Sequence, residues 1–389
     1  MSLQTSLDAR PDLYESVADL ETPALILDLD VLDRNLAEYT ALASEHDVSL
    51  RTHMKTTKIP DLAHYVLEET GDGIICQTLG ETEVMAASGI DDIYDYSMVV
   101  TETKLDHLLR VAEKVDHFET NVSGPEHVER FERAAANRDQ RLGIVLEIDT
   151  GGGRFGVDPG QPAVEVAAQI HEADHLDLTA LKTFEAHVKQ DPDVETPDEY
   201  ERACFAAMDE MRRTKDGIED AGIAVETVKA GQSATVRYTA KHPVVTEINP
   251  GKFLVNDISE LSFTSYDLDE EDCALSVLST VIAKPSADRV MVDAGRKALV
   301  SHQTDTSEVA AADQRARPRH RTGVHYLQGY EEQGIVDVSN ADDEIEVGDV
   351  IEFIPTTAHT TLNLHDTLIG VRDEQVVDVW DVQARGKVK

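Results

Sequence analysis

The sequence predicts a (β/α)8 barrel followed by a second, mostly β domain. From about residue 24 to residue 258, short apolar runs alternate with amphipathic helical patterns. This alternation indicates parallel strands joined by right-handed crossovers. After Asp257, short β-like runs separated by turn residues replace the alternation, and little helical periodicity remains.

The barrel region contains nine candidate strands, one more than a (β/α)8 barrel needs. They cover residues 24–28, 48–52, 73–77, 93–97, 117–121, 143–149, 178–184, 225–230 and 245–248. We expect the first of them, 24–28, to belong elsewhere. Helical patterns lie between the strands at residues 31–44, 59–69, 81–88, 104–114, 125–136 and 197–221. Pro125 and Pro197 suit the first turn of a helix, where the missing N–H costs nothing.

The expected division is an N-terminal extension over residues 1–20, the barrel over 21–258 and the β domain over 259–389. In the last part, β-like runs occur at residues 275–282, 289–292, 334–338, 350–354, 367–372 and 375–380. Residues 302–323 interrupt them with a polar stretch that contains Arg315, Arg317, Arg319 and Arg321. We expect this stretch to be an exposed loop.

The charge of the chain excludes one class of partner. Lysine and arginine number 35 against 76 acidic residues, a formal net charge of −41, so nucleic-acid phosphates would be repelled. The acidic residues are spread over helix faces and do not form a tail. Such a diffuse excess is typical of proteins from salt-in halophiles, where molar salt shortens the Debye length to ~3 Å. An acidic protein from a mesophile is the alternative.

Other features of the composition point to the cytoplasm. Cys76, Cys204 and Cys273 lie far apart and form no CxxC pair, so neither a disulfide framework nor a thiolate zinc site is indicated. The N-terminus lacks the basic region and apolar core of a signal peptide. No apolar run approaches the ~20 residues that span a bilayer. We expect a soluble, cytoplasmic protein without a membrane partner.

Lys55 is the first candidate catalytic residue. It lies in the segment Arg51-Thr-His-Met-Lys-Thr-Thr-Lys58, between a strand pattern and a helix pattern. Enzymes built on parallel sheets keep their chemistry at such junctions. A lysine there is a solvated charge, a phosphate contact or a Schiff-base former.

Three further segments follow predicted strands. Residues 151–156, Gly-Gly-Gly-Arg-Phe-Gly, let the backbone turn sharply and aim Arg154 into the barrel mouth. Residues 230–235 and 249–253 follow the last two barrel strands, where barrel enzymes bind phosphate. No Walker loop or GxGxxG motif is present. A phosphate-bearing cofactor beside a lysine fits pyridoxal phosphate, whose aldehyde needs a lysine and whose phosphate needs an anion site.

These segments together resemble the D-threonine aldolase and D-serine dehydratase group of pyridoxal-phosphate enzymes, which have the alanine-racemase-like fold. The matching segments run from about residue 20 to residue 366, at 21–25, 51–56, 76–81, 149–156, 184–187, 231–235, 292–295 and 363–366. The resemblance implies that the N-terminal strand, 24–28, joins the β domain. It also implies a homodimer in which the β domain of one subunit covers the barrel mouth of the other.

The resemblance assigns roles to residues of this chain. Lys55 would form the Schiff base with the cofactor, and Gln77, Arg154, Ser233, Gly251 and Lys252 would contact it. The family also binds a divalent metal (Mn, Mg or Zn) through a histidine and a cysteine or aspartate two residues later. An ungapped alignment places Thr357 and His359 there, so the usual pair is broken and His359 is the candidate metal ligand. A shifted alignment would instead make His359 the family histidine, with Thr361 in the second place, and an ordinary pocket or surface histidine is the other alternative.

Two other departures lie in the barrel. Thr57 replaces a second histidine of the family, and Phe184 replaces a tyrosine. If no metal binds, the β-oxygen of the substrate would have to be handled by protein groups such as His53 or His187.

The resemblance implies a lyase that acts on a D-β-hydroxy amino acid, with retro-aldol cleavage to glycine and an aldehyde as the leading activity. A D-serine or 3-hydroxyaspartate dehydratase is the alternative within the same class. An amino-acid racemase would need a second acid–base group, usually tyrosine, facing Lys55. A non-catalytic pyridoxal-phosphate carrier is a single-domain barrel, and the β domain argues against it.

The charge yields a first testable prediction. Because a formal charge of −41 opposes folding at low ionic strength, the melting temperature should rise with KCl well into the molar range. Scanning calorimetry between dilute and molar KCl measures this. A flat melting temperature would remove the halophile interpretation.

Overall fold

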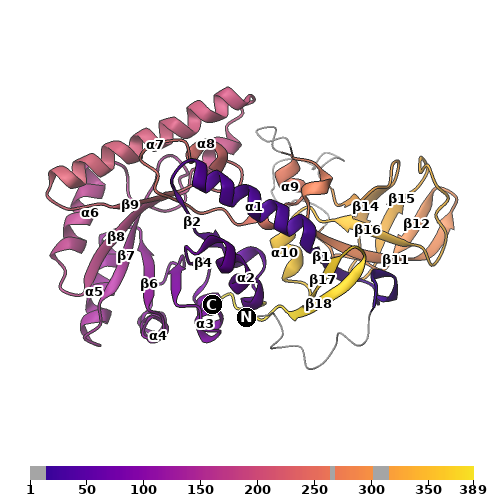
Figure 1. Ribbon diagram of the computed structural model, residues 1–389, viewed down its shortest axis with the longest axis horizontal. Helices are drawn as coiled ribbons and strands as arrows, with labels where there is room; N and C mark the ends of the chain where they lie inside the picture. Colours follow the sequence, from indigo (N-terminus) through magenta and orange to yellow (C-terminus); the bar gives the residue numbers. More distant parts are fainter. Residues whose placement is uncertain (1–14, 263–267, 301–314) are drawn as a thin grey trace.

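The computed structural model describes residues 15–262, 268–300 and 315–389 (Figure 1). Within these residues, one all-parallel sheet of nine short strands forms a barrel, in the order β2-β10-β9-β8-β7-β6-β5-β4-β3. The strands are β2 (Ser49–Leu50), β3 (Thr52–His53), β4 (Ile74–Cys76), β5 (Asp92–Asp95), β6 (His117–Val122), β7 (Leu142–Ile148), β8 (Leu176–Thr183), β9 (Thr227–Ala230) and β10 (Glu247–Ile248). β2 and β3 are separated by Arg51 alone, and they pair with β10 and β4 respectively. The two ends of the sheet are therefore joined through Arg51, and the predicted barrel is confirmed.

Helices follow the barrel strands and cover the outside of the sheet (Figure 1). They are α2 (Pro60–Thr70), α3 (Leu79–Ala87), α4 (Glu102–Ala112), α5 (Pro125–Ala136), α6 (Gln161–Glu172), α7 (Pro197–Asp220) and α8 (Val236–Thr239). The short α9 (Ile258–Leu261) lies beside the second sheet, where Ile258 packs with Cys273 and Ile354 (Figure 1). Pro125 and Pro197 occupy first turns as expected, and Thr196 with Glu199 forms a capping box at the start of α7. None of the helices in the described residues is both long and apolar enough to cross a bilayer.

The second sheet contains the N-terminal strand, as the sequence predicted. β1 (Ala24–Asp28) runs antiparallel to β11 (Leu275–Ser286) and parallel to β17 (Thr367–Arg372). The other strands are β12 (Arg289–Val292), β13 (Arg317–Pro318), β14 (His325–Gly329), β15 (Gly334–Asp337), β16 (Val350–Ile354) and β18 (Gln375–Asp381). Helix α1 (Leu29–Glu45) follows β1 and contacts both β2 of the barrel and β17 of the second sheet. It thereby packs the two sheets into one molecule.

The expectation of an exposed loop over residues 302–323 is wrong for part of that stretch. Residues 302–314 lie outside the described residues, but Arg317–Pro318 forms β13 and pairs with β16. The Arg319 Nε lies 2.7 Å from a Glu352 carboxylate oxygen, and its side chain is largely buried. The prediction took the arginines of this stretch as a sign of exposure. Arginines that are paired with carboxylates can instead lie in a protein interior, as Arg319 does here.

The barrel interior is held by buried ion pairs. Arg51 Nε lies 3.1 Å from Glu247 Oε2, and the Arg51 guanidinium also pairs with Asp92. Lys229 Nζ lies 3.0 Å from Glu247 Oε1 and 2.7 Å from Glu119 Oε2. Although burial disfavours its charge, the pKa of Glu247 is lowered because Lys229 and Arg51 neutralise it. This network forms the floor beneath the barrel mouth.

Breaking the network should destabilise the fold. Arg51→Met leaves Glu247 with one cationic partner fewer in a water-poor interior, and losing a partner of a buried pair costs about 3–5 kcal/mol. Urea unfolding in high salt measures the change. Arg141→Met removes the exposed pair with Asp177 and serves as the control, with little expected change. Equal stabilities of the two variants would contradict a structural role for the network.

Candidate active site

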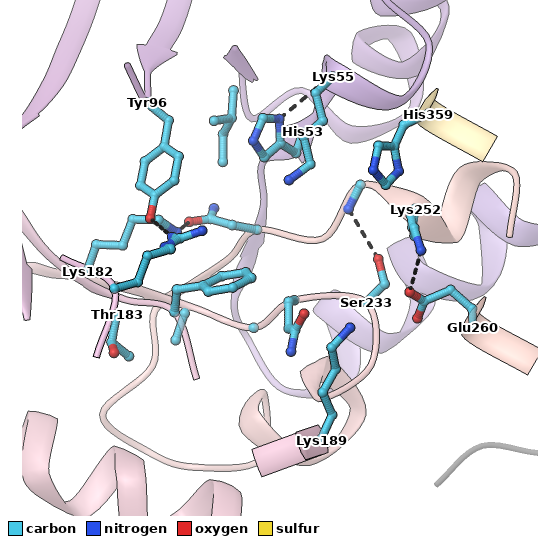
Figure 2. A pocket seen from close by; sticks show the side chains of 18 residues that line it. His53, Lys55, Tyr96, Lys182, Thr183, Lys189, Ser233, Lys252, Glu260 and His359 are labelled. Carbon is cyan, nitrogen blue, oxygen red and sulfur yellow. Dashed lines mark hydrogen bonds and ion pairs between the residues drawn. The ribbon is translucent and has the colours of Figure 1, made fainter. Parts of the chain in front are cut away.

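A pocket opens at the carboxyl end of the barrel strands, where one wall is supplied by α10 (Ala358–Leu362) of the second domain (Figure 2). Most residues that the sequence nominated line this pocket, although they come from five separate segments. They are His53, Lys55, Arg154, Ser233, Gly251, Lys252 and His359. Gln77 and His187 are not among its lining residues.

Lys55 projects into the pocket from a short 3-10 helix, η3 (Met54–Thr56), directly after β3. Its backbone N–H donates to His53 Nδ1 at 3.4 Å. Burial, with Arg154 and Lys252 nearby, lowers the pKa of Lys55 to about 8. About a tenth of this amine is therefore neutral and nucleophilic at pH 7, far more than for an ordinary lysine.

His53 is held on both ring nitrogens. Its Nδ1 accepts from Lys55 N–H, and its Nε2 lies 3.1 Å from Gln77 Oε1. Burial and the neighbouring Lys55 keep the pKa of His53 well below its ordinary value, so the ring is neutral. His53 is thus placed to orient the turn that carries Lys55. Gln77 contacts His53 but does not itself line the pocket.

Arg154 is fixed by aromatic residues. Its Nη2 donates to the Tyr96 hydroxyl at 2.7 Å, and that hydroxyl donates to Glu147 Oε1 at 2.7 Å. The guanidinium carbon lies 4.1 Å and 4.3 Å from the ring centroids of Phe155 and Phe184. Phe184, a departure noted in the sequence, therefore packs on the arginine through a cation–π contact.

The two glycine-containing loops meet at Ser233. The Ser233 Oγ accepts from the backbone N–H groups of Gly251 at 3.4 Å and Phe253 at 3.2 Å, so its own proton is available to a ligand. A Cβ on Gly251 would lie 2.6 Å from the His53 carbonyl oxygen, so only glycine allows this approach. These loops follow β9 and β10, where a barrel binds phosphate.

Sequence reasoning missed two residues of this anion site. Glu185 Oε1 accepts from Gly231 N–H at 3.1 Å and from the hydroxyls of Thr235 at 2.6 Å and Thr239 at 2.9 Å. Glu185 thereby fixes the loop that begins at Gly231. Gln232 lines the pocket, and its buried Nε2 has no hydrogen-bond partner within the described chain. An unsatisfied donor at this place calls for an anionic ligand, so the donor set fits pyridoxal phosphate.

The Lys252 side chain forms ion pairs with acidic residues that come shortly after it in the sequence. Its Nζ lies 3.1 Å from Asp257 Oδ2 and 3.2 Å from Glu260 Oε1, and it also donates to Ser259. Burial opposes the charge on Lys252, but Asp257 and Glu260 outweigh burial and raise its pKa. Lys252 is a cation held in the pocket wall.

His359 reaches the pocket from α10 and lies beside Lys252 (Figure 2). Its Nδ1 is buried and has no hydrogen-bond partner among the described residues. Burial, reinforced by the charge of Lys252, lowers the pKa of His359 to about 3, so the ring is neutral. It therefore offers the pocket an unused acceptor or donor nitrogen.

His187 lies apart from Lys55. It lines a neighbouring pocket with Asp149 and Gly152, and a Cβ on Gly151 would lie 3.1 Å from its Nε2. The two pockets share Arg154 and Phe184 in their linings. Lys55 and His187, both predicted from the sequence to be catalytic candidates, thus line different pockets.

The residues around His359 do not fit a divalent metal site. In the described ranges, the group of three metal-ligating side chains with ligand atoms within 4.8 Å of one another is Glu270, Glu271 and His320, outside this pocket. Asp257 is buried near His359, but Lys252, Ser259 and the N–H groups of Glu260 and Ala358 occupy its oxygens. A metal ion here would have to displace a resident ammonium group.

Comparison with known proteins places the chain in a family. Residues 27–259 match the model for the N-terminal domain of alanine racemase, and residues 274–371 match the model for a serine dehydratase domain. The first match covers more than half of the chain.

Relatives match over nearly their whole length. A D-threonine aldolase of Arthrobacter sp. is 29% identical over 96% of this chain and 94% of its own. A 3-hydroxy-D-aspartate aldolase of Paracoccus denitrificans is 28% identical over 98% and 96%. The crystal structure of D-threonine aldolase from Filomicrobium marinum superposes with a TM-score of 0.88, at 30% identity over 98% and 99% of the two chains. The chain therefore belongs to the alanine racemase N-terminal domain family, as a pyridoxal-phosphate-dependent lyase with a second domain of the serine dehydratase type.

Proposed function

We propose that this lyase cleaves the Cα–Cβ bond of a D-β-hydroxy amino acid to give glycine and an aldehyde. One observation carries the proposal: a neutral histidine with an unpartnered ring nitrogen, His359, shares a pocket with Lys55 and an anion-binding loop. Retro-aldol cleavage needs a group that takes the β-hydroxyl proton, and this nitrogen is a free acceptor in the pocket, which its low pKa keeps unprotonated at neutral pH. The aldolases of Arthrobacter and Paracoccus, matched along almost their whole length, support the same reaction.

The barrel residues bind and orient the reactants. Lys55 would hold the cofactor and give up its place to the substrate amine, which its lowered pKa favours. Ser233, Gln232 and the N–H groups of their loop would bind the phosphate. Pyridoxal phosphate, when bound, accepts the electron pair of the bond that breaks at Cα.

His359 would accept the proton of the β-hydroxyl as that oxygen becomes the aldehyde carbonyl. The proton removed there balances the one that Cα gains when glycine forms. His53 is less suited to this step because both of its ring nitrogens already have partners. His187 lines a different pocket.

Two alternatives predict other products. A dehydratase, like the D-threo-3-hydroxyaspartate dehydratase of Delftia sp. that is 27% identical over 74% of this chain, would release ammonia and an oxo acid. A racemase needs a tyrosine free to exchange protons, whereas the Tyr96 hydroxyl in this pocket bonds both Glu147 and Arg154. We also retain the expectation of a cytoplasmic homodimer, which light scattering would test for its oligomeric part.

The experiment incubates purified enzyme with D-threonine, D-serine and 3-hydroxy-D-aspartate in molar KCl and identifies the products by mass spectrometry. We expect glycine and the matching aldehyde from at least one substrate. Release of ammonia and an oxo acid without glycine would replace the aldolase proposal by a dehydratase, and a changed configuration at Cα alone would indicate a racemase.

Reloading of the apoenzyme should report the pKa of Lys55. The neutral amine is the nucleophile, so the rate of cofactor binding should rise with pH and level off above about 8, where deprotonation is complete. The visible absorbance of the bound cofactor follows the reaction. Lys55→Ala should not develop that band, while Lys58→Arg, which keeps the ion pair with Glu81, should. An inflection near the ordinary lysine value of 10.5 would contradict a buried amine.

Substitution of His359 should impair chemistry more than binding. His359→Ala should lower kcat by about 10²–10⁴, the usual worth of a general base, and leave the cofactor band in place. Steady-state kinetics with the best substrate measures kcat and KM separately. The base is misassigned if His187→Ala lowers kcat more than His359→Ala does.

A further inference from the structure

The wall that carries His359 already contains a cation. Lys252 begins the short turn that comes after β10 and Gly251, and its Nζ is surrounded by Asp257, Ser259 and Glu260. An ammonium group has three N–H donors, and the three side chains supply an acceptor for each. Lys252 and Glu260 both line the same pocket as Lys55.

Asp257 ties this cation to His359. Its carboxylate is fully buried and accepts the backbone N–H of Ala358, the residue before His359, at 2.9 Å. It also caps α9 by accepting the N–H of Glu260 at 3.1 Å. One carboxylate therefore fixes the ammonium of the barrel relative to the imidazole of the second domain, and Figure 2 shows the two side chains next to each other.

The same groups would be needed to bind a metal ion. Near His359, the candidate ligands are the carboxylates of Asp257 and Glu260 and the unpartnered imidazole nitrogen. The Lys252 ammonium lies within 3.2 Å of both carboxylates, which is where a divalent ion would have to be coordinated. Two cations cannot share these oxygens, because like charges at such a distance repel strongly.

We propose that Lys252 is the resident cation of this wall, that it compensates Asp257 and Glu260 where a divalent ion would have to bind, and that the enzyme works without a divalent metal. The location of the β-oxygen here rests on the proposed function. When the hydroxyl proton passes to His359, negative charge develops on that oxygen. Lys252 keeps Asp257 and Glu260 from adding two uncompensated negative charges beside that oxygen.

The proposal is tested first on the wild-type holoenzyme. We expect substoichiometric divalent metal by mass spectrometry after purification without chelator, and the same kcat before and after treatment with EDTA. A stoichiometric metal whose removal abolishes activity, and whose return restores it, would overturn the proposal.

Variants of Lys252 provide the second test. Lys252→Gln should lower kcat by about 10²–10³, as the loss of one preorganised electrostatic group does, with the visible cofactor band and KM little changed. Lys241→Gln, which removes a surface lysine paired with Glu201, is the matched control and should retain wild-type kcat. Wild-type kcat in Lys252→Gln would refute the assignment.

A third measurement does not depend on the reaction. Lys252→Ala leaves Asp257 and Glu260 without their cation, so Mn2+ should bind this variant more tightly than wild type in isothermal titration. Equal Mn2+ affinity in the two proteins would contradict the claim that Lys252 occupies the place of a metal. Should the enzyme cleave none of the three substrates, the proposed function fails, while the metal content and the Mn2+ titration still decide whether Lys252 is the resident cation.

Discussion

The buried ion pair between Arg51 and Glu247 is the constraint on which the site depends. It joins the first and last strands of the barrel, and each strand continues directly into a reactive segment. Four residues after Arg51 the chain reaches Lys55, and four residues after Glu247 it reaches Gly251. The His53 N–H donates to the Pro250 carbonyl at 2.9 Å, so the two segments stay in register beyond the strands. Barrel closure thereby sets the distance between the nucleophilic lysine and the anion loop.

A second link joins the domains at the same place. Asp257 follows the last barrel strand, and it binds Lys252 on one side and the N-terminus of α10 on the other. His359 is therefore positioned relative to the barrel by a charged hydrogen bond and not by packing alone. Because Asp257 and Ala358 are separated by about a hundred residues, the chemistry of the pocket depends on both domains being folded together.

Periodicity and turn residues sufficed for the barrel, because each strand and helix is specified by its own local pattern. The same local logic found Lys55 and the two phosphate loops, since both lie at predicted strand ends. It did not identify Glu185 or the acceptors around Lys252, because their roles depend on contacts that form only in the folded chain. It also could not separate His187 from Lys55, because both follow barrel strands and only the packing of Gly151 against the histidine assigns it to the neighbouring pocket. The strand at Arg317–Pro318 was not predicted for a related reason: its partner β16 is distant in sequence.

The central claim is that Lys55, among the four lysines of the pocket, binds the cofactor. The other three are Lys182, Lys189 and Lys252. Borohydride reduction of the holoenzyme, followed by proteolysis and peptide sequencing by mass spectrometry, identifies the modified lysine directly. The account predicts one pyridoxyl group per chain, on Lys55. Modification of Lys182, Lys189 or Lys252 in its place would contradict it.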